Sequence, residues 1–268
     1  MTMRREVTPF GLTFATAMTK YSHDTVVPFK DSELGKKQQV ADMFDRIAFR
    51  YDFLNRFLSG GIDIYWRKKA IRVLAEGKDT REWNILDVAT GTADMAIMMN
   101  RYLSPEKITG IDISTGMLDI GRQKIARLKL DSKIQLFTGD SEAIHFPDNS
   151  FDAISVAFGV RNFENLEKGL QEMRRVLRPG GRLVILEFSQ PKKAGFRQLY
   201  ELYLRLVAPG IGRLLSKSRE AYAYLNESVR AFPEGDDFVG ILDKNGYRNT
   251  RLRRLSLGIC TIYTGEKM

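Results

Sequence analysis

The sequence has few cysteines and histidines, and this scarcity limits the chemistry that the protein can perform. Among 268 residues there is one cysteine, Cys260, and there are two histidines, His23 and His145. A single cysteine excludes an internal disulfide, and three such residues are too few for a Cys/His metal site. We therefore expect no metal centre and a cytoplasmic location.

The sequence also lacks any apolar run of the length that spans a bilayer. Its first five residues resemble the basic start of a signal peptide, but Thr, Gly and Lys interrupt the apolar residues that follow. With 43% hydrophobic residues and 8 prolines, the composition is that of a soluble globular protein. We predict one large α/β domain behind an N-terminal extension.

The sequence has fewer acidic than basic residues, 33 against 42, and its formal net charge is +9. Such a charge favours an anionic partner, either a nucleic acid or an acidic membrane surface. A generally basic, solvated surface explains the same number equally well. Charge alone leaves these alternatives open.

The most informative stretch covers residues 84–96, which read N-I-L-D-V-A-T-G-T-A-D-M-A. An apolar run ends in a turn of small residues around Gly91, and a helix-compatible segment begins at Asp94. Backbone amides in such a turn can approach a ligand closely. About twenty residues later Asp112 ends the next apolar strand, where an acid accepts hydrogen bonds from ribose hydroxyls. This pairing predicts a nucleoside cofactor.

Strands and helices alternate along most of the chain, which is typical of a parallel, doubly wound sheet. Before the alternation, helical spacing from Lys37 predicts two amphipathic helices broken near residues 59–61, then a helix from Ile64 to Ala75 with Arg67 facing outward. Residues 248–255 and 258–264 are predicted to pair as a closing hairpin. Ligands of such a sheet bind at the carboxyl ends of its strands.

Two cofactors fit the turn, a dinucleotide and S-adenosylmethionine. A pyrophosphate usually requires G-x-G-x-x-G, but here Gly91 is flanked by Ala89 and Ala93. A second acid, Asp140, follows the third strand, where it can meet an adenine amino group. These features favour S-adenosylmethionine.

Beyond the extension, the chain resembles the ubiquinone/menaquinone biosynthesis C-methyltransferase family from about Lys37 to Gly265. The motifs that carry this resemblance are Y-D-F-L-N (51–55), L-D-V-A-T-G-T-A-D (86–94), D-I-S-T-G-M-L (112–118), G-D-S-E-A-I-H-F-P-D-N-S-F-D (139–152), F-G-V-R-N (158–162), R-V-L-R-P-G-G-R-L-V-I-L-E-F-S (175–189) and Y-L-N-E-S-V-R-A-F-P (224–233). The first, fifth and last of these are the narrowest, and they point to quinone substrates.

The resemblance implies a class I S-adenosylmethionine-dependent methyltransferase fold, a Rossmann-like sheet that is mostly parallel with a C-terminal antiparallel hairpin. It divides the chain into a partly disordered extension (1–36) and a methyltransferase domain (37–268), with a helical lid (37–80) and a helical cover (190–235).

The same resemblance implies that S-adenosylmethionine contacts Thr92, Asp112, Asp140 and Ser141, beside the turn that contains Ala89 and Gly91. Thr90 and Ala93 stand where family members usually have glycine, and Ala157 stands where they often have serine. We therefore expect one hydrogen bond to the cofactor to be missing.

The implied reaction is methylation of a ring carbon in a polyprenylated quinol, with Arg161, Asn162 and Asp94 as candidate catalytic residues. Arginine stays protonated, so Arg161 is better suited to stabilise a phenolate than to accept its proton. Asp94 is equally a first-turn acid that favours a helix N-terminus, and Arg161 can also be a structural ion-pair partner.

The resemblance makes Tyr51, Asp52 and Asn55 a lid over the substrate, although one helical face of this kind also packs against a core. A polyprenyl tail stays in the bilayer, so we expect transient association with the inner, anionic membrane surface, through the basic and aromatic segment from Pro191 to Arg219. A homodimer is compatible with the free edge of the hairpin.

Two other classes stay open at this point, a nucleic-acid methyltransferase and a cofactor-binding protein without catalysis. The first is disfavoured because the sequence has no N-P-P-Y-like motif, and the second because Arg161 and Asn162 are intact. Among acceptors, demethylmenaquinol is favoured over a 2-methoxy-6-polyprenyl-1,4-benzoquinol.

Overall fold

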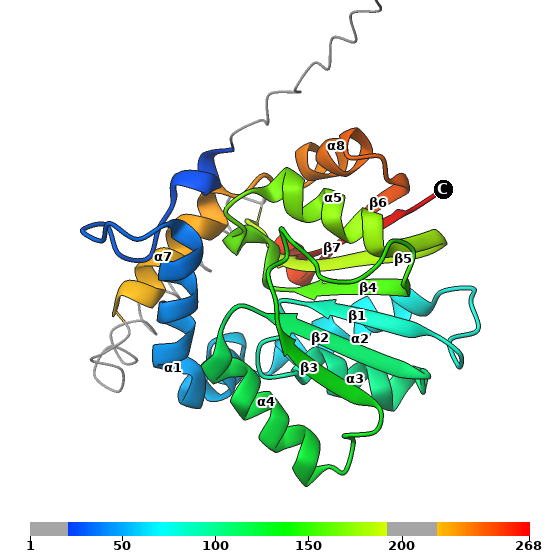
Figure 1. Ribbon diagram of the computed structural model, residues 1–268. Coiled ribbons are helices and arrows are strands. Elements are labelled where there is room, and N and C mark those ends of the chain that lie inside the picture. The colour runs from blue at the N-terminus through cyan, green and yellow to red at the C-terminus, as the bar shows by residue number, and fades with distance from the viewer. Residues whose placement is uncertain (1–20, 192–218) are drawn as a thin grey trace, which may run out of the picture.

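The computed structural model describes residues 21–191 and 219–268. Seven strands and the helices between them follow the alternation that the sequence predicts (Figure 1). In chain order the elements are η1 (Ser22–Thr25), α1 (Lys36–Ser59), α2 (Ile62–Ala75), β1 (Asn84–Val88), α3 (Asp94–Leu103), β2 (Lys107–Asp112), α4 (Thr115–Arg127), β3 (Ile134–Thr138), β4 (Phe151–Ala157), η2 (Val160–Asn162), α5 (Leu166–Val176), β5 (Leu177–Phe188), α7 (Arg219–Ala231), α8 (Asp236–Lys244), β6 (Arg248–Leu255), η3 (Ser256–Gly258) and β7 (Cys260–Glu266).

One sheet contains all seven strands, in the order β3-β2-β1-β4-β5-β7-β6. The first five strands of the chain pair in parallel, whereas β7 pairs antiparallel with both β5 and β6. This arrangement confirms the predicted mostly parallel sheet with a C-terminal hairpin. The strand order reverses between β1 and β4, and ligands of doubly wound sheets bind at such a reversal.

Helices cover both faces of the sheet (Figure 1). On one face α2, α3 and α4 bury apolar side chains such as Ile71, Met99 and Leu118 against the strands. On the other face α5 and α8 bury Leu170, Met173 and Phe238 among others. The apolar residues of these five helices that recur at helical spacing bury one side of each helix against the sheet, so the hydrophobic effect fixes the layers.

Helices α1 and α7 lie at the edge of the sheet where the parallel strands end (Figure 1). Val40 and Met43 of α1 pack there against Tyr224 of α7. The predicted break near residues 59–61 is confirmed, because α1, a helix of 24 residues, runs to Ser59; the predicted third helix is wrong, because α2 begins directly after the break, at Ile62. Helix α1 ends at Gly60, whose φ of 57° is left-handed and favours glycine.

Several predictions about domain organisation stay predictions. Residues 1–20 and 192–218, which include most of the extension and of the predicted cover, lie outside the described residues. Residues 21–35 contain η1, and His23 there is buried. Within 21–191 and 219–268, no helix combines the length and apolar character that crossing a bilayer demands.

Candidate active site

A pocket lies at the carboxyl edge of the sheet, beside the strand reversal. Together with the open solvent at its mouth, the pocket encloses about 650 Å³. The segments that follow β1, β2, β3 and β4 form one side of it, and α1 forms the other. Helix α1 contributes Lys37, Val40, Phe44 and Tyr51 to the lining.

The turn after β1 presents its main chain to this pocket. Ala89 and Gly91 both line the pocket, with φ angles of 53° and 55°. On the other side of the switch point, a Cβ at Gly159 would lie 2.5 Å from the Cβ of Ala89. Only glycine therefore allows the ends of β1 and β4 to approach this closely.

A buried carboxylate holds the turn in place. Asp87 of β1 accepts hydrogen bonds from the Thr90 hydroxyl at 2.7 Å and from the Ser155 hydroxyl at 2.5 Å. Burial raises the pKa of Asp87 to about 6. Thr90 stands where the resemblance leads us to expect glycine, and its bond to Asp87 gives it a structural role in the turn.

Asp112, at the end of β2, already accepts two backbone hydrogen bonds at the pocket wall. Its Oδ2 accepts from the Gly91 N–H at 2.8 Å and its Oδ1 from the Ser114 N–H at 2.9 Å. Burial raises the pKa of the Asp112 carboxyl to about 6, although both hydrogen bonds act to lower it. Each carboxylate oxygen can accept a further hydrogen bond, so the side chain fits the ribose diol that the sequence predicts.

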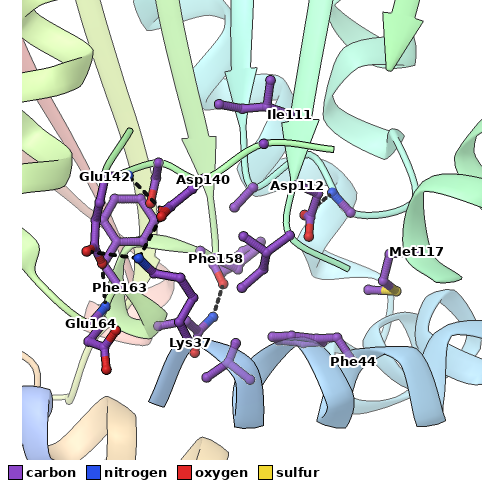
Figure 2. Close-up of a pocket in the computed structure, with 18 of the residues that line it drawn as sticks. Lys37, Phe44, Ile111, Asp112, Met117, Asp140, Glu142, Phe158, Phe163 and Glu164 are labelled. Atoms are coloured by element: carbon purple, nitrogen blue, oxygen red, sulfur yellow. Dashed lines mark hydrogen bonds and ion pairs between the residues drawn. The ribbon is translucent and has the colours of Figure 1, made fainter. Parts of the chain in front are cut away.

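At the end of β3, Asp140 is paired with a lysine from α1. Figure 2 shows Lys37 directed toward Asp140 and Glu142, with N–O distances of 2.6 and 3.1 Å. Ser141 lines the same part of the pocket. The structure thus places the two predicted adenine contacts together, and it adds a cation that the sequence analysis did not anticipate.

Thr92 and Asp94 are not among the residues that line this pocket. Thr92 donates to Asp52 at 2.6 Å, and Lys124 of α4 is 2.9 Å from Asp52. Asp94 pairs with Lys124 and, at 2.8 Å, with Arg56. Burial acts to raise the pKa of Asp94, but Lys124 and its cationic neighbours hold it below the usual value. We refer to Asp52, Arg56, Thr92, Asp94 and Lys124 as the α1/α3/α4 ion cluster.

Arg161, in η2 after β4, is buried in an ion pair with Glu187 at the end of β5. Its Nη1 lies 2.9 Å from Glu187 Oε1 and 2.5 Å from the carbonyl oxygen of Phe158. Among the described residues its Nε has no hydrogen-bond partner. The guanidinium is therefore anchored on one side and retains donor capacity on the other.

Asn162 lines the pocket next to Arg161. The Tyr224 hydroxyl of α7 donates to Asn162 Oδ1 at 3.1 Å. This bond fixes the orientation of the amide, because its oxygen is already engaged. The Nδ2 group, 3.5 Å from the Phe158 carbonyl, remains a donor.

Of the three predicted lid residues, one lines the pocket and a second is its hydrogen-bond partner. Tyr51 lines the pocket, and its hydroxyl hydrogen-bonds to the side chain of Asn55. Burial raises the pKa of Tyr51, whereas the charges of Arg161 and Arg67 act to lower it. Asp52 belongs to the ion cluster instead.

Arg67 of α2 is one of the functional candidates that the sequence analysis missed. The prediction that it faces outward is wrong, because its side chain is buried, 3.6 Å from Asp63 and 5.2 Å from the centre of the Phe158 ring. Glu187 was missed as well, although an acid that ends an apolar strand is the same signal that identified Asp112. No local signal marks Lys37, whose partners lie more than 100 residues later.

The model of the ubiE/COQ5 methyltransferase family matches residues 32–267. A Bacteroides fragilis protein named demethylmenaquinone methyltransferase is 46% identical over 92% of this chain and 99% of that relative. A Geotalea daltonii protein named ubiquinone/menaquinone biosynthesis C-methyltransferase UbiE is 48% identical over 89% of this chain and 100% of that relative.

Solved structures are similar in fold at lower identity. A SAM dependent methyltransferase from Aquifex aeolicus has a TM-score of 0.55 at 20% identity, covering 74% of this chain and 89% of its own. A possible histamine N-methyltransferase from Thermotoga maritima has a TM-score of 0.57 at 16% identity, covering 85% and 99%. These likenesses confirm the predicted fold class.

Proposed function

Because the chain belongs to the ubiE/COQ5 methyltransferase family, we propose that it methylates a ring carbon of a polyprenylated quinol, with demethylmenaquinol as acceptor and S-adenosylmethionine as methyl donor. The observation that carries this proposal is the buried Arg161–Glu187 pair next to Asn162, which lines the same pocket as Asp112 and Asp140. An acceptor site and a nucleoside site thus adjoin. The Bacteroides fragilis relative's name supports the naphthoquinol, and a benzoquinol is the alternative.

The residues at the pocket fit the proposed cofactor. Asp112 has free acceptor capacity for two hydroxyls, Asp140 and Ser141 lie at the adenine end, and the main chain of Ala89 and Gly91 is open to a ligand. When bound, S-adenosylmethionine supplies an electrophilic methyl group. The chain's own residues must then orient the acceptor and stabilise the charge that develops on it.

Arg161 has the chemistry to stabilise a quinol phenolate. A ring carbon beside a hydroxyl becomes nucleophilic when that hydroxyl loses its proton, so a nearby cation promotes the reaction. Glu187 holds the guanidinium in place, and the Nε of Arg161 has no hydrogen-bond partner within the described part of the chain. Arg67 is a second buried cation whose charge, like that of Arg161, acts on Tyr51 at the pocket.

Asn162 is proposed to orient the acceptor hydroxyl through its Nδ2 donor, with Tyr224 fixing the amide. Tyr51 lines the α1 side of the same site, and Asn55 hydrogen-bonds to its hydroxyl. Neither Arg161 nor Asp94 suits the role of proton acceptor, because an arginine stays protonated and Asp94 is paired with Arg56 and Lys124.

The test is methyl transfer by Arg161→Gln with a short-chain quinol acceptor. Removing one preorganised donor from a developing anion typically lowers kcat about 10²–10³-fold, and we expect that loss with the cofactor Kd within twofold of wild type. Arg175→Gln is the matched control, since Arg175 is also paired with carboxylates but belongs to α5, none of whose residues lines the pocket. Unchanged turnover of Arg161→Gln contradicts the proposal.

The same assay distinguishes the two acceptors. Demethylmenaquinol and a 2-methoxy-6-prenyl-1,4-benzoquinol of equal prenyl length are compared by kcat/KM. A higher value for the benzoquinol overturns the naphthoquinol assignment and leaves the methyl transfer itself intact.

Transient membrane association is part of this proposal. Each CH₂ of a prenyl tail that leaves the bilayer costs about 0.8 kcal/mol, so an enzyme that visits the membrane reaches its acceptor more cheaply. The net charge of +9 is complementary to an anionic leaflet. The segment that the sequence predicts for this contact, from Pro191 to Arg219, lies almost entirely outside the described residues.

A further inference from the structure

Helix α1 has two different faces over its length. One face lines the active-site pocket with Lys37, Val40, Phe44 and Tyr51. The other face carries Phe49, Phe53 and Phe57, which recur every four residues and so lie on one side of the helix. We call these three residues the α1 aromatic face.

The α1 aromatic face is exposed to solvent to an unusual degree. The exposed fractions are 89% for Phe49, 58% for Phe53 and 53% for Phe57. The rings of Phe53 and Phe57 stack with their centres 5.9 Å apart. Directly after the turn that ends α1, Ile62 and Tyr65 of α2 are exposed as well, at 45% and 49%. Clustered exposed apolar residues of this kind mark contact with another protein or with a membrane.

The charges around this face are positive. Helices α1 and α2 carry nine lysines and arginines; Lys36 and Arg67 are buried, Lys37 and Arg56 are held in ion pairs, and the others are Arg46, Arg50, Lys68, Lys69 and Arg72. Arg46 and Arg50 are exposed and lie on the same side of α1 as the three phenylalanines.

Three of the four aspartates of these helices are engaged by other groups of the chain. Asp45 accepts hydrogen bonds from Ser114 and Gly116, and Asp52 is held by Thr92 and Lys124. Asp63 is buried beside Arg56, and Asp42 is half-buried. Aromatic rings flanked by arginines are typical of helices that lie in the interface of an anionic bilayer.

We propose that the α1 aromatic face inserts into an anionic phospholipid bilayer, with Arg46 and Arg50 contacting lipid phosphates. This inference rests on the proposed function, which requires a prenylated acceptor. It assigns the membrane contact to the helix that also walls the active-site pocket. Docking through α1 therefore places the pocket next to the membrane that holds the acceptor.

The test is co-sedimentation of the full chain with vesicles of phosphatidylcholine alone and of phosphatidylcholine mixed with phosphatidylglycerol. The variant Phe49→Ser/Phe53→Ser/Phe57→Ser is expected to bind the anionic vesicles at least tenfold more weakly than wild type. Tyr102→Ser/Leu128→Ser is the matched control, because these residues are about as exposed, at 47% and 49%, but lie elsewhere. The control is expected to bind like wild type.

A single substitution gives an independent readout that survives if the triple variant fails to fold. In Phe53→Trp, fluorescence is expected to increase on anionic vesicles and to be quenched by lipids brominated on their acyl chains. Arg46→Gln/Arg50→Gln is expected to lose the preference for phosphatidylglycerol. Equal vesicle binding by wild type and the triple variant, or an unquenched Phe53→Trp, overturns the proposal.

Two further measurements separate this proposal from its alternatives. Turnover of a tail-free, water-soluble quinol is expected to be the same in wild type and the triple variant; if wild type has no such turnover, the proposed function fails while the vesicle result is unaffected. If the triple variant lowers the molar mass in light scattering and leaves vesicle binding unchanged, the α1 aromatic face is a dimer interface and the membrane assignment is wrong.

Discussion

The turn after β1 contributes to two neighbouring regions that differ in chemistry, the active-site pocket and the α1/α3/α4 ion cluster. The pocket receives main chain at Ala89 and Gly91, together with the carboxylates of Asp112 and Asp140. The ion cluster receives the side chains of Thr92 and Asp94, which contact α1 and α4. Neighbouring residues of one sequence motif thus have different roles. The main chain of Ala89 and Gly91 is available to a ligand, whereas the side chains of Thr92 and Asp94 hold α1 and α4 in place.

The largest loss of cofactor affinity is expected from removing the Asp112 carboxylate, which connects the turn after β1 to the pocket. In Asp112→Ala, the cofactor loses a charged hydrogen-bond acceptor worth about 1.5–3 kcal/mol, so the Kd for S-adenosylmethionine is expected to rise about 10- to 100-fold. Isothermal titration calorimetry measures this change. Asp112→Asn, which keeps one acceptor, is expected to lose less, and an unaltered Kd in Asp112→Ala places the nucleoside elsewhere.

Cofactor binding should depend on pH through the same residue. The folded-state pKa of Asp112 is raised to about 6, so below pH 6 the free carboxyl is protonated and accepts ribose hydroxyls less well. The Kd is expected to rise as pH falls below 6, by at most about tenfold per pH unit. The contribution of Asp112 to the free energy of unfolding changes with pH in the opposite direction. It is fully present below the pKa of the unfolded chain and is lost as pH rises through about 6. Asp112→Asn should remove the pH dependence of the Kd. If the Kd of this variant still rises below pH 6, protonation of Asp112 is not the cause.

The ion cluster is expected to matter for folding more than for the cofactor. Asp94→Asn removes a carboxylate from Lys124 and Arg56, and the free energy of unfolding is expected to fall by about 1 kcal/mol, with the cofactor Kd within twofold of wild type. Chemical denaturation and calorimetry measure the two quantities. If Asp94 is catalytic instead, Asp94→Asn should lower kcat greatly and leave the free energy of unfolding unchanged.

The smallest effect is expected at Lys37, which pairs with Asp140 where adenine is predicted to bind. A partly exposed ion pair is worth about 0–1 kcal/mol, so Lys37→Met, which frees Asp140, should lower the cofactor Kd by no more than about fivefold. Lys124→Met, in the ion cluster, is the control and should leave the Kd unchanged. A weaker affinity in Lys37→Met would show that the lysine assists binding.

The sequence predicts the pocket better than it predicts the ion cluster, for a physical reason. Strand ends, the turn at Gly91 and the acid at Asp112 follow from local patterns and from the rule that ligands bind where parallel strands end. The partners of Lys37, Thr92 and Asp94 come from segments 30 to 103 residues away. Arg67 shows the same limit, because helical spacing cannot reveal that Asp63 and the ring of Phe158 accommodate a buried charge.

The central claim is that this pocket transfers a methyl group to a quinol carbon. The direct measurement incubates wild type and Asp112→Ala with S-adenosylmethionine carrying a ¹³C-methyl group and reduced demethylmenaquinone, and locates the label in the product by NMR. We predict that wild type places the label on a ring carbon and that Asp112→Ala does so far more slowly. A label on oxygen, or none in any quinol product, would contradict the account.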